Sequence, residues 1–137
     1  MKIGALAQSL GITTDTIRFY EKQGLLGAPR RADNGYRVYG EADKTRMQFI
    51  LRCKLAGFSL QEIEQLLQLR LDRETAHCAD VKRVTQQKLE RVEARIKELV
   101  EVKATLSWLV NNCCGGQESA MNCTILEALE SENGPFN

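Results

Sequence analysis

The sequence predicts a mainly α-helical fold in which a small helical head precedes one long helix. Apolar residues recur at helical spacing through most of the first 70 residues, which indicates several short amphipathic helices. Residues 79–111 contain neither Pro nor Gly and carry an apolar stripe, which indicates a single long helix. The dipeptide Asn34-Gly35, which follows two arginines, signals a β-hairpin. The predicted class is therefore helical with one short two-stranded ribbon.

Length and composition exclude several classes of protein. The chain has 137 residues, of which 43% are hydrophobic and 27% charged, as in an ordinary soluble protein of one or two small domains. Its N-terminus lacks the apolar core of a signal peptide, and no stretch reaches the roughly 18 apolar residues of a membrane span. We expect a cytoplasmic protein with no membrane partner. In reducing surroundings its five cysteines should be free or metal-bound rather than paired in disulfides.

The charge is divided unevenly along the chain. Residues 1–56 hold ten Lys and Arg against five Asp and Glu, a balance of +5, whereas residues 57–137 hold nine against thirteen, a balance of −4. A basic first half followed by an acidic second half suggests a polyanion-binding module joined to a segment with another role.

Two short helices open the chain. The first is expected over residues 2–10 and ends at Gly11, and the second runs over residues 14–23 with Thr13 or Thr14 as its N-cap. This pattern fits a helix-turn-helix, whose second helix enters the major groove of DNA and would present Arg18. A helical hairpin that only packs against the core has the same spacing.

The next stretch favours DNA binding over the plain hairpin. Asn34-Gly35 predicts a tight turn, and the residues after it alternate as in a strand. The ribbon concentrates basic and aromatic side chains: Arg30, Arg31, Tyr36, Arg37 and Tyr39. Such a basic ribbon beside a helix-turn-helix is typical of a wing that contacts phosphates.

Two further helices complete the head. The first is expected over residues 41–56, ends at Gly57 and turns its apolar residues inward: Ala42, Met47, Ile50, Leu51 and Leu55. The second extends to about residue 70, and Ser59 with Glu62 forms the capping box that starts it. Cys53 lies far from the other cysteines, so we expect a small buried side chain.

The long helix requires a partner. Its stripe consists of apolar residues three to five positions apart: Val81, Val84, Leu89, Val92, Ile96, Leu99, Val102, Leu106 and Leu109. At 1.5 Å per residue the helix is roughly 50 Å long, which is more than the rest of the chain can cover. A coiled coil with a second copy, parallel or antiparallel, is the economical solution.

Cysteines at both ends of this helix distinguish the two orientations. Cys78 precedes the helix, whereas Cys113, Cys114 and Cys123 follow it. A rigid helix keeps the two groups apart within one chain, but an antiparallel dimer places Cys78 of one chain beside the other three of its partner. We therefore expect a thiolate metal site that spans the dimer interface.

The donor set restricts the ion. Thiolates suit copper(I), zinc, cadmium, mercury and lead, and a third thiolate from the partner favours a divalent ion of higher coordination, with tetrahedral zinc a good fit. Adjacent side chains such as Cys113 and Cys114 point apart, so two ions per site are also possible. Cys123 begins an expected short helix, Cys123 to Ser131, whose N-terminus lowers the pKa of the thiol.

Three stretches, ITTDTIRFYEKQGLL, NGYRVYGEAD and FILRCKLAGFSLQEIEQLL, resemble the DNA-binding domain of the MerR family of transcription regulators. The resemblance implies a winged helix-turn-helix DNA-binding domain at residues 1–70, a linker and a dimerisation helix at 71–111, and a metal-binding loop with a short helix at 112–137. It also implies an antiparallel coiled coil in a homodimer, with promoter DNA and RNA polymerase as partners. In this family the effector makes the dimer distort an over-long promoter spacer. By position, the implied DNA contacts are Arg18, Tyr20, Tyr36, Arg37 and Tyr39.

Within the family, the cysteine pattern is similar to the zinc-responsive, ZntR-like branch. That branch carries a histidine in the middle of the loop, where this chain has Glu118. The alternatives are a carboxylate ligand, water or phosphate in its place, or specificity for cadmium or lead. The expected ligands are Cys78, Cys113, Cys114 and Cys123, with Zn²⁺ favoured and Cd²⁺ or Pb²⁺ as alternatives. His77 and Glu118 stay outside this set.

Two other functions are alternatives to metal sensing. A redox or iron–sulfur switch would use the same cysteines, but the chain lacks the C-x-x-C runs of cluster ligation. A catalytic thiol needs a general base, and the single histidine, His77, is a weak candidate for one. We therefore expect a regulator of a metal efflux or resistance promoter rather than an enzyme.

Overall fold

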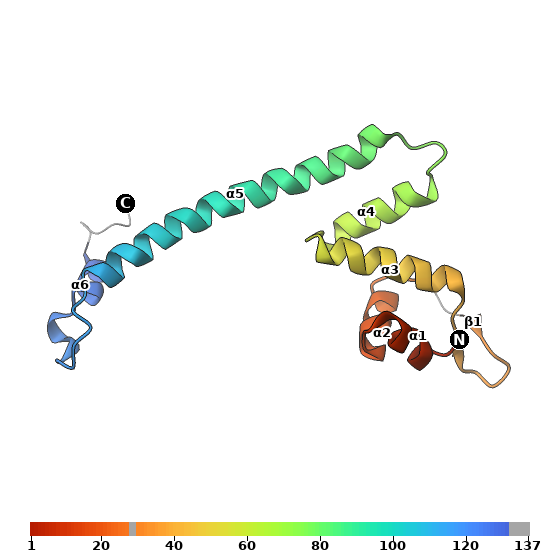
Figure 1. Ribbon diagram of the computed structural model, residues 1–137, viewed down its shortest axis with the longest axis horizontal. Helices are drawn as coiled ribbons and strands as arrows, with labels where there is room; N and C mark the ends of the chain where they lie inside the picture. The colour runs from red at the N-terminus through yellow and green to blue at the C-terminus, as the bar shows by residue number, and fades with distance from the viewer. Residues whose placement is uncertain (28–29, 132–137) are drawn as a thin grey trace. The chain divides into compact units, whose positions relative to one another are not determined.

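The computed structural model describes residues 1–27 and 30–131, and helices make up most of these residues (Figure 1). The elements in chain order are α1 Ile3–Leu10, α2 Thr14–Lys22, β1 Arg30–Arg31, β2 Arg37–Val38, α3 Glu41–Leu55, α4 Leu60–Leu71, α5 Cys78–Asn111, the 3₁₀ helix η1 Ala120–Asn122 and α6 Thr124–Glu130. The predicted class, mainly helical with a small two-stranded ribbon and one long helix, is confirmed. The chain divides into two compact units, Met1–Gln86 and Gln87–Asn137. The predicted division into three segments stays a prediction.

Helices α1 and α2 form the predicted helix-turn-helix. Gly11 ends α1 with a left-handed φ of 68°, and its N–H donates to the carbonyl of Gln8 at 3.2 Å. Of the two expected caps it is Thr13 that begins α2, because its hydroxyl accepts the backbone N–H of Thr16 at 3.2 Å. Local sequence signals thus position the second helix.

The predicted ribbon is also confirmed. Strands β1 and β2 pair antiparallel, with Arg31 opposite Arg37. The turn between them depends on Gly35, whose φ of 83° favours glycine, and on Asn34, whose side-chain oxygen accepts the N–H of Tyr36 at 3.1 Å. The ribbon therefore forms beside α1 and α2 and carries its arginines there.

One apolar core holds together the head, which is the part of the first unit that extends from α1 to α4. Its fully buried side chains come from every part of the head: Leu6, Ile17, Leu26, Tyr39, Met47, Ile50 and Ile63. Helix α4 begins with the predicted capping box, because Ser59 accepts the N–H of Glu62 at 3.2 Å and Glu62 accepts the N–H of Ser59 at 2.7 Å. Cys53 is buried as predicted, and burial raises the pKa of its thiol.

Two residues of α3 do not face inward as predicted. Leu55 is 90% exposed and Ala42 is also exposed. The inward face of α3 advances in steps of three through Met47, Ile50 and Cys53. Leu55 lies two residues beyond Cys53, about 200° further round the helix, and therefore points to solvent.

The long helix α5 has 34 residues, and its stripe is largely uncovered within the chain. Val84 packs against the core of the head and Leu109 is buried near the other end. The remaining stripe residues, from Val81 to Leu106, are between 42% and 55% exposed. A half-exposed apolar stripe of this length needs a partner surface. None of the described helices combines the length and apolarity that crossing a membrane requires.

Candidate functional site

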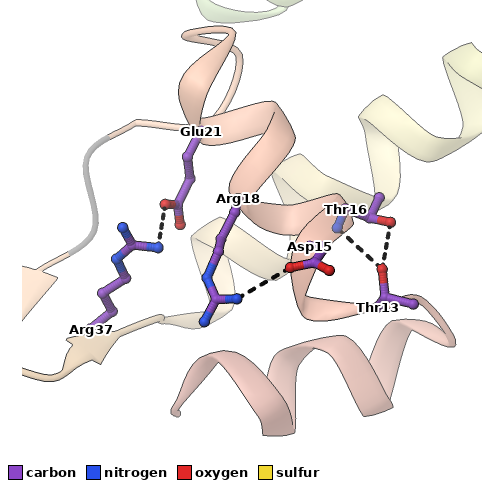
Figure 2. A network of polar contacts seen from close by, with 6 residues as sticks. All are labelled: Thr13, Asp15, Thr16, Arg18, Glu21 and Arg37. Atoms are coloured by element: carbon purple, nitrogen blue, oxygen red, sulfur yellow. Dashed lines mark hydrogen bonds and ion pairs between the residues drawn. The ribbon is translucent and has the colours of Figure 1, made fainter.

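Basic side chains of α2 and β2 lie on one surface of the head. Arg18 projects from α2 and its Nη1 lies 3.3 Å from Oδ1 of Asp15 (Figure 2). Arg37 projects from β2 and its Nη1 lies 3.1 Å from Oε2 of Glu21, near the end of the same helix. Each guanidinium is thus held by one carboxylate and still partly exposed, which leaves donors for an anionic partner.

These arginines border an open hollow of about 740 Å³, named here the recognition hollow. Its walls come from α1, α2 and the ribbon: Lys2, Ile3, Gly4, Ala5, Arg18, Arg31, Gly35, Tyr36 and Arg37. Four of these side chains are basic and none is acidic. Nζ of Lys2 lies 5.4 Å from the centre of the exposed Tyr36 ring. Cations around an open hollow suit the phosphates of a nucleic acid.

The structure differs from the prediction at two tyrosines. Tyr20 and Tyr39 are 4% and 1% exposed, so their rings belong to the core rather than to the recognition surface. Tyr20 lies three residues after buried Ile17, on the same inward face of α2. The hydroxyl of Tyr39 donates to Glu21, and burial, followed by this hydrogen bond, raises the pKa of Tyr39 to about 12. Both rings therefore support the surface from beneath.

Sequence reasoning missed two residues of this surface. Glu21 receives the hydroxyl of Tyr39 and pairs with Arg37, so one carboxylate joins the core to the ribbon. The sequence signal that could have identified Glu21 was its position beside Tyr20 and one turn after Arg18 on α2. Lys2 was also missed, because it precedes α1 and has no motif of its own.

Three of the predicted metal ligands lie together in the cysteine loop, residues 112–124. They line a hollow of about 470 Å³ with Glu118 and backbone from η1 to the start of α6. Cys123 is the N-cap residue of α6, which extends over Thr124–Glu130 and so begins one residue later than predicted. Its pKa is lowered by the backbone N–H groups of Leu126 and Ile125, in that order, and by a weaker hydrogen bond from Cys113.

The loop arranges its donors in two pairs. Cys113 lies close enough to Cys123 to contribute to the lowered pKa of its thiol, and both line the same hollow. The thiol of Cys114 donates to Oε2 of Glu118 with a separation of 3.6 Å. Thiols and a carboxylate are ligands of soft and borderline divalent ions, so this donor set fits zinc, cadmium or lead.

Cys78 is not part of this group within one chain. It is the first residue of α5 and is exposed, whereas the loop follows the last residue of that helix. A helix of 34 residues is about 50 Å long. Among residues 1–27 and 30–131, no three His, Cys, Asp or Glu side chains are arranged to hold an ion. The junction of Cys78 with the loop of a second copy stays a prediction.

His77 lies at the surface next to Cys78. Its ring is 84% exposed, and its Nδ1 lies 3.8 Å from Oδ2 of Asp80. The backbone N–H of His77 donates to the same carboxylate at 2.9 Å, which caps the start of α5. This local role accounts for the contacts of the residue.

Two family models match the chain. A model described as "MerR HTH family regulatory protein" matches residues 1–70, and a second described as "MerR, DNA binding" matches residues 45–109. Together they cover the head and almost all of α5.

Known proteins are similar over nearly the whole length. The HTH-type transcriptional regulator ZntR of Escherichia coli (strain K12) is 43% identical over 94% of this chain and 92% of its own length. The mercuric resistance operon regulatory protein of Serratia marcescens is 36% identical over 98% and 91%. The crystal structure of the transcription regulator PbrR691 from Ralstonia metallidurans CH34 in complex with lead(II) superposes with a TM-score of 0.84, at 35% identity, over 94% of this chain and 98% of that one.

Proposed function

The chain belongs to the MerR family of regulatory proteins, and from this premise we propose that it is a metal-sensing transcriptional activator. It acts as a homodimer on the double-stranded DNA of a metal efflux or resistance promoter. Binding of a divalent soft ion, with Zn²⁺ favoured, makes the dimer distort the operator so that RNA polymerase can use both promoter elements. The ion is held by Cys113, Cys114 and Cys123 of one chain with Cys78 of the other.

One observation carries this proposal: three cysteines line one small hollow while the fourth lies at the opposite end of α5. Within one chain the fourth thiol is too far away to complete the site. In an antiparallel dimer, the Cys78 thiol of the second copy lies at the end of α5 that is followed by the cysteine loop. A site made from both chains can report ion binding to both heads, because it is complete only at one relative position of the chains.

The uncovered stripe of α5 supports the dimer. Six positions between Leu89 and Leu106 are about half exposed on one side of the helix: Leu89, Val92, Ile96, Leu99, Val102 and Leu106. Packing against the same stripe of a second copy would remove this apolar area from water, at about 25 cal/mol per Å². The antiparallel orientation is favoured by the cysteines rather than by the stripe itself.

The proposed DNA contacts are Arg18, Tyr36 and Arg37 on the recognition hollow, with Lys2 and Arg31 beside them. Arg18 lies on the second helix of the helix-turn-helix, which is the helix that enters the major groove in such folds. The ribbon then contacts the flanking phosphates. Tyr20 and Tyr39 position these groups from the core.

A cadmium or lead response is the second candidate. His77, the only histidine of the chain, lies at the start of α5, so the cysteine loop has no imidazole for zinc. A relative of 35% identity has been solved with lead(II). Reporter induction by zinc, cadmium, lead, mercury and copper salts at matched free-ion concentrations would decide between these ions.

The experiment that tests the cross-chain site is Cys78→Ser. We expect loss of metal-dependent transcription from the reporter with operator binding retained, because Cys78 lies outside the recognition hollow. Cys53→Ala is the matched control, since it removes a thiol that is buried in the core of the head. A full metal response by Cys78→Ser would contradict the proposed site.

The iron–sulfur alternative has its own test. The metal content and absorbance of anaerobically purified protein would reveal an iron–sulfur cluster by its brown colour.

A further inference from the structure

The cysteine loop contains one acidic side chain, Glu118, to which the proposed function assigns no role. Its Oε2 lies 3.6 Å from Sγ of Cys114. We propose that Glu118 is a metal ligand, so that its carboxylate and the Cys114 thiolate together hold a divalent ion with mixed oxygen and sulfur ligands. The inference rests on the proposed function and adds a ligand and an ion preference to it.

The distance between the two side chains already suits coordination. Zinc binds thiolate sulfur at about 2.3 Å and carboxylate oxygen at about 2.0 Å, so two such ligands of a tetrahedral ion lie about 3.5 Å apart. The observed separation of Sγ and Oε2 is 3.6 Å. The thiol releases its proton to solvent on binding, and the ion takes the place of that proton between sulfur and oxygen. No rearrangement of the pair is required.

The backbone beneath Glu118 provides the space for its carboxylate. A Cβ built on Gly116 would lie 2.0 Å from Oε2 and 2.7 Å from Cδ of Glu118. The carboxylate therefore lies in the space that any other residue at position 116 would fill. Gly115, with a φ of 67°, makes the turn that brings this backbone under the side chain.

The second donor pair of the loop is of a different kind. Cys113 lies beside Cys123, which also receives backbone N–H groups at the start of α6. One pair is therefore sulfur with sulfur, and the other is sulfur with oxygen. A hard oxygen ligand favours zinc over copper(I) and mercury(II), which prefer sulfur alone. Glu118 would thus direct the loop toward a borderline divalent ion.

The test compares Glu118→Gln with the unaltered full chain, both reduced and free of metal. Zinc affinity is measured by competition with a chromophoric chelator, and Co²⁺ serves as the spectroscopic probe. We expect the affinity of the Glu118→Gln variant for one zinc ion to fall by about tenfold or more. The cobalt d–d bands should change, whereas the thiolate-to-cobalt charge-transfer band should persist. Mercury(II) binding should be unchanged.

Two further variants make the result specific. Gly116→Ala leaves the carboxylate in the chain but displaces it, so it should weaken zinc binding in the same direction. Glu130→Gln removes one negative charge from exposed α6 and should have no effect. Wild-type zinc affinity and an unchanged cobalt spectrum in Glu118→Gln would overturn this inference. If Cys113→Ser still abolished binding in that case, the metal-sensing proposal would stand, whereas failure of the unaltered chain to bind either ion would remove both.

Discussion

The head and the segment that follows it differ in how many of their apolar side chains are buried. The head buries large apolar side chains from α1 to α4 and holds its basic surface in place with Glu21 and Asp15. From residue 87 to residue 131 only Leu109 and Ala128 are buried. The head therefore has a core of its own, whereas α5 keeps most of its apolar side chains about half exposed.

This difference separates recognition from sensing. A recognition surface that stands on a closed core keeps its geometry whether or not an effector is present. A sensing site completed by a second chain, as we propose for the cysteine loop, would respond to the assembly and to the ion together. Changes in the head should thus act on folding or on DNA affinity, and changes in α5 or the loop should act on assembly or on the metal response.

The largest effect is expected from a charge in the uncovered stripe. Ile96→Asp places a carboxylate where two apolar stripes would meet, and burying an unpaired charge costs about 3–5 kcal/mol for each copy of the substitution. Analytical ultracentrifugation should then show a monomer. The head should stay folded, as judged by the near-ultraviolet signal of its tyrosines, because its core does not include Ile96.

Lys97→Glu is the matched control for this prediction, because it changes a charge at the neighbouring, polar position of α5. We expect it to remain a dimer. A dimeric Ile96→Asp protein of unchanged stability would show that the stripe does not form the interface, and the contrast between the two regions would lose its basis.

A smaller effect is expected from a cavity in the head. Ile63→Ala removes a fully buried side chain of α4, which should lower the free energy of unfolding of the head by about 2–5 kcal/mol. Urea titration followed by circular dichroism measures it. Leu55→Ala is the comparison, since Leu55 is 90% exposed and its truncation should change stability by less than about 0.5 kcal/mol. Equal effects at the two positions would contradict the observed packing of α3 and α4.

Tyr39 shows where local sequence spacing stops being informative. Features encoded by neighbouring residues were predictable, among them the Gly11 stop, the Ser59 and Glu62 capping box and the Asn34-Gly35 turn. The inward or outward position of Tyr39 was not, because it depends on Glu21, which lies 18 residues away in α2. Distant partners decide such cases, and local spacing does not report them.

The same limit applies to the cysteine loop. Thiolate chemistry, the helix start after Cys123 and the wide separation from Cys78 followed from spacing and composition. The pairing of Cys114 with Glu118 did not, because it depends on the backbone turn at Gly115 and on the empty space above Gly116. Because adjacent side chains point apart, the sequence predicts different neighbours for Cys113 and Cys114, but it does not identify those neighbours.

The smallest effect should come from Arg18→Ala, which probes the recognition hollow alone. Arg18 is bound by exposed Asp15 and is no part of the core, so the head should keep its stability. Loss of one guanidinium from a DNA surface should weaken operator binding by about 1–3 kcal/mol, by the same amount with and without metal. Fluorescence anisotropy at several salt concentrations measures this, with Arg95→Ala on α5 as a control of equal charge change. Unchanged affinity would remove Arg18 from the contact surface, and a metal-dependent loss would show that head and sensor are not separate after all.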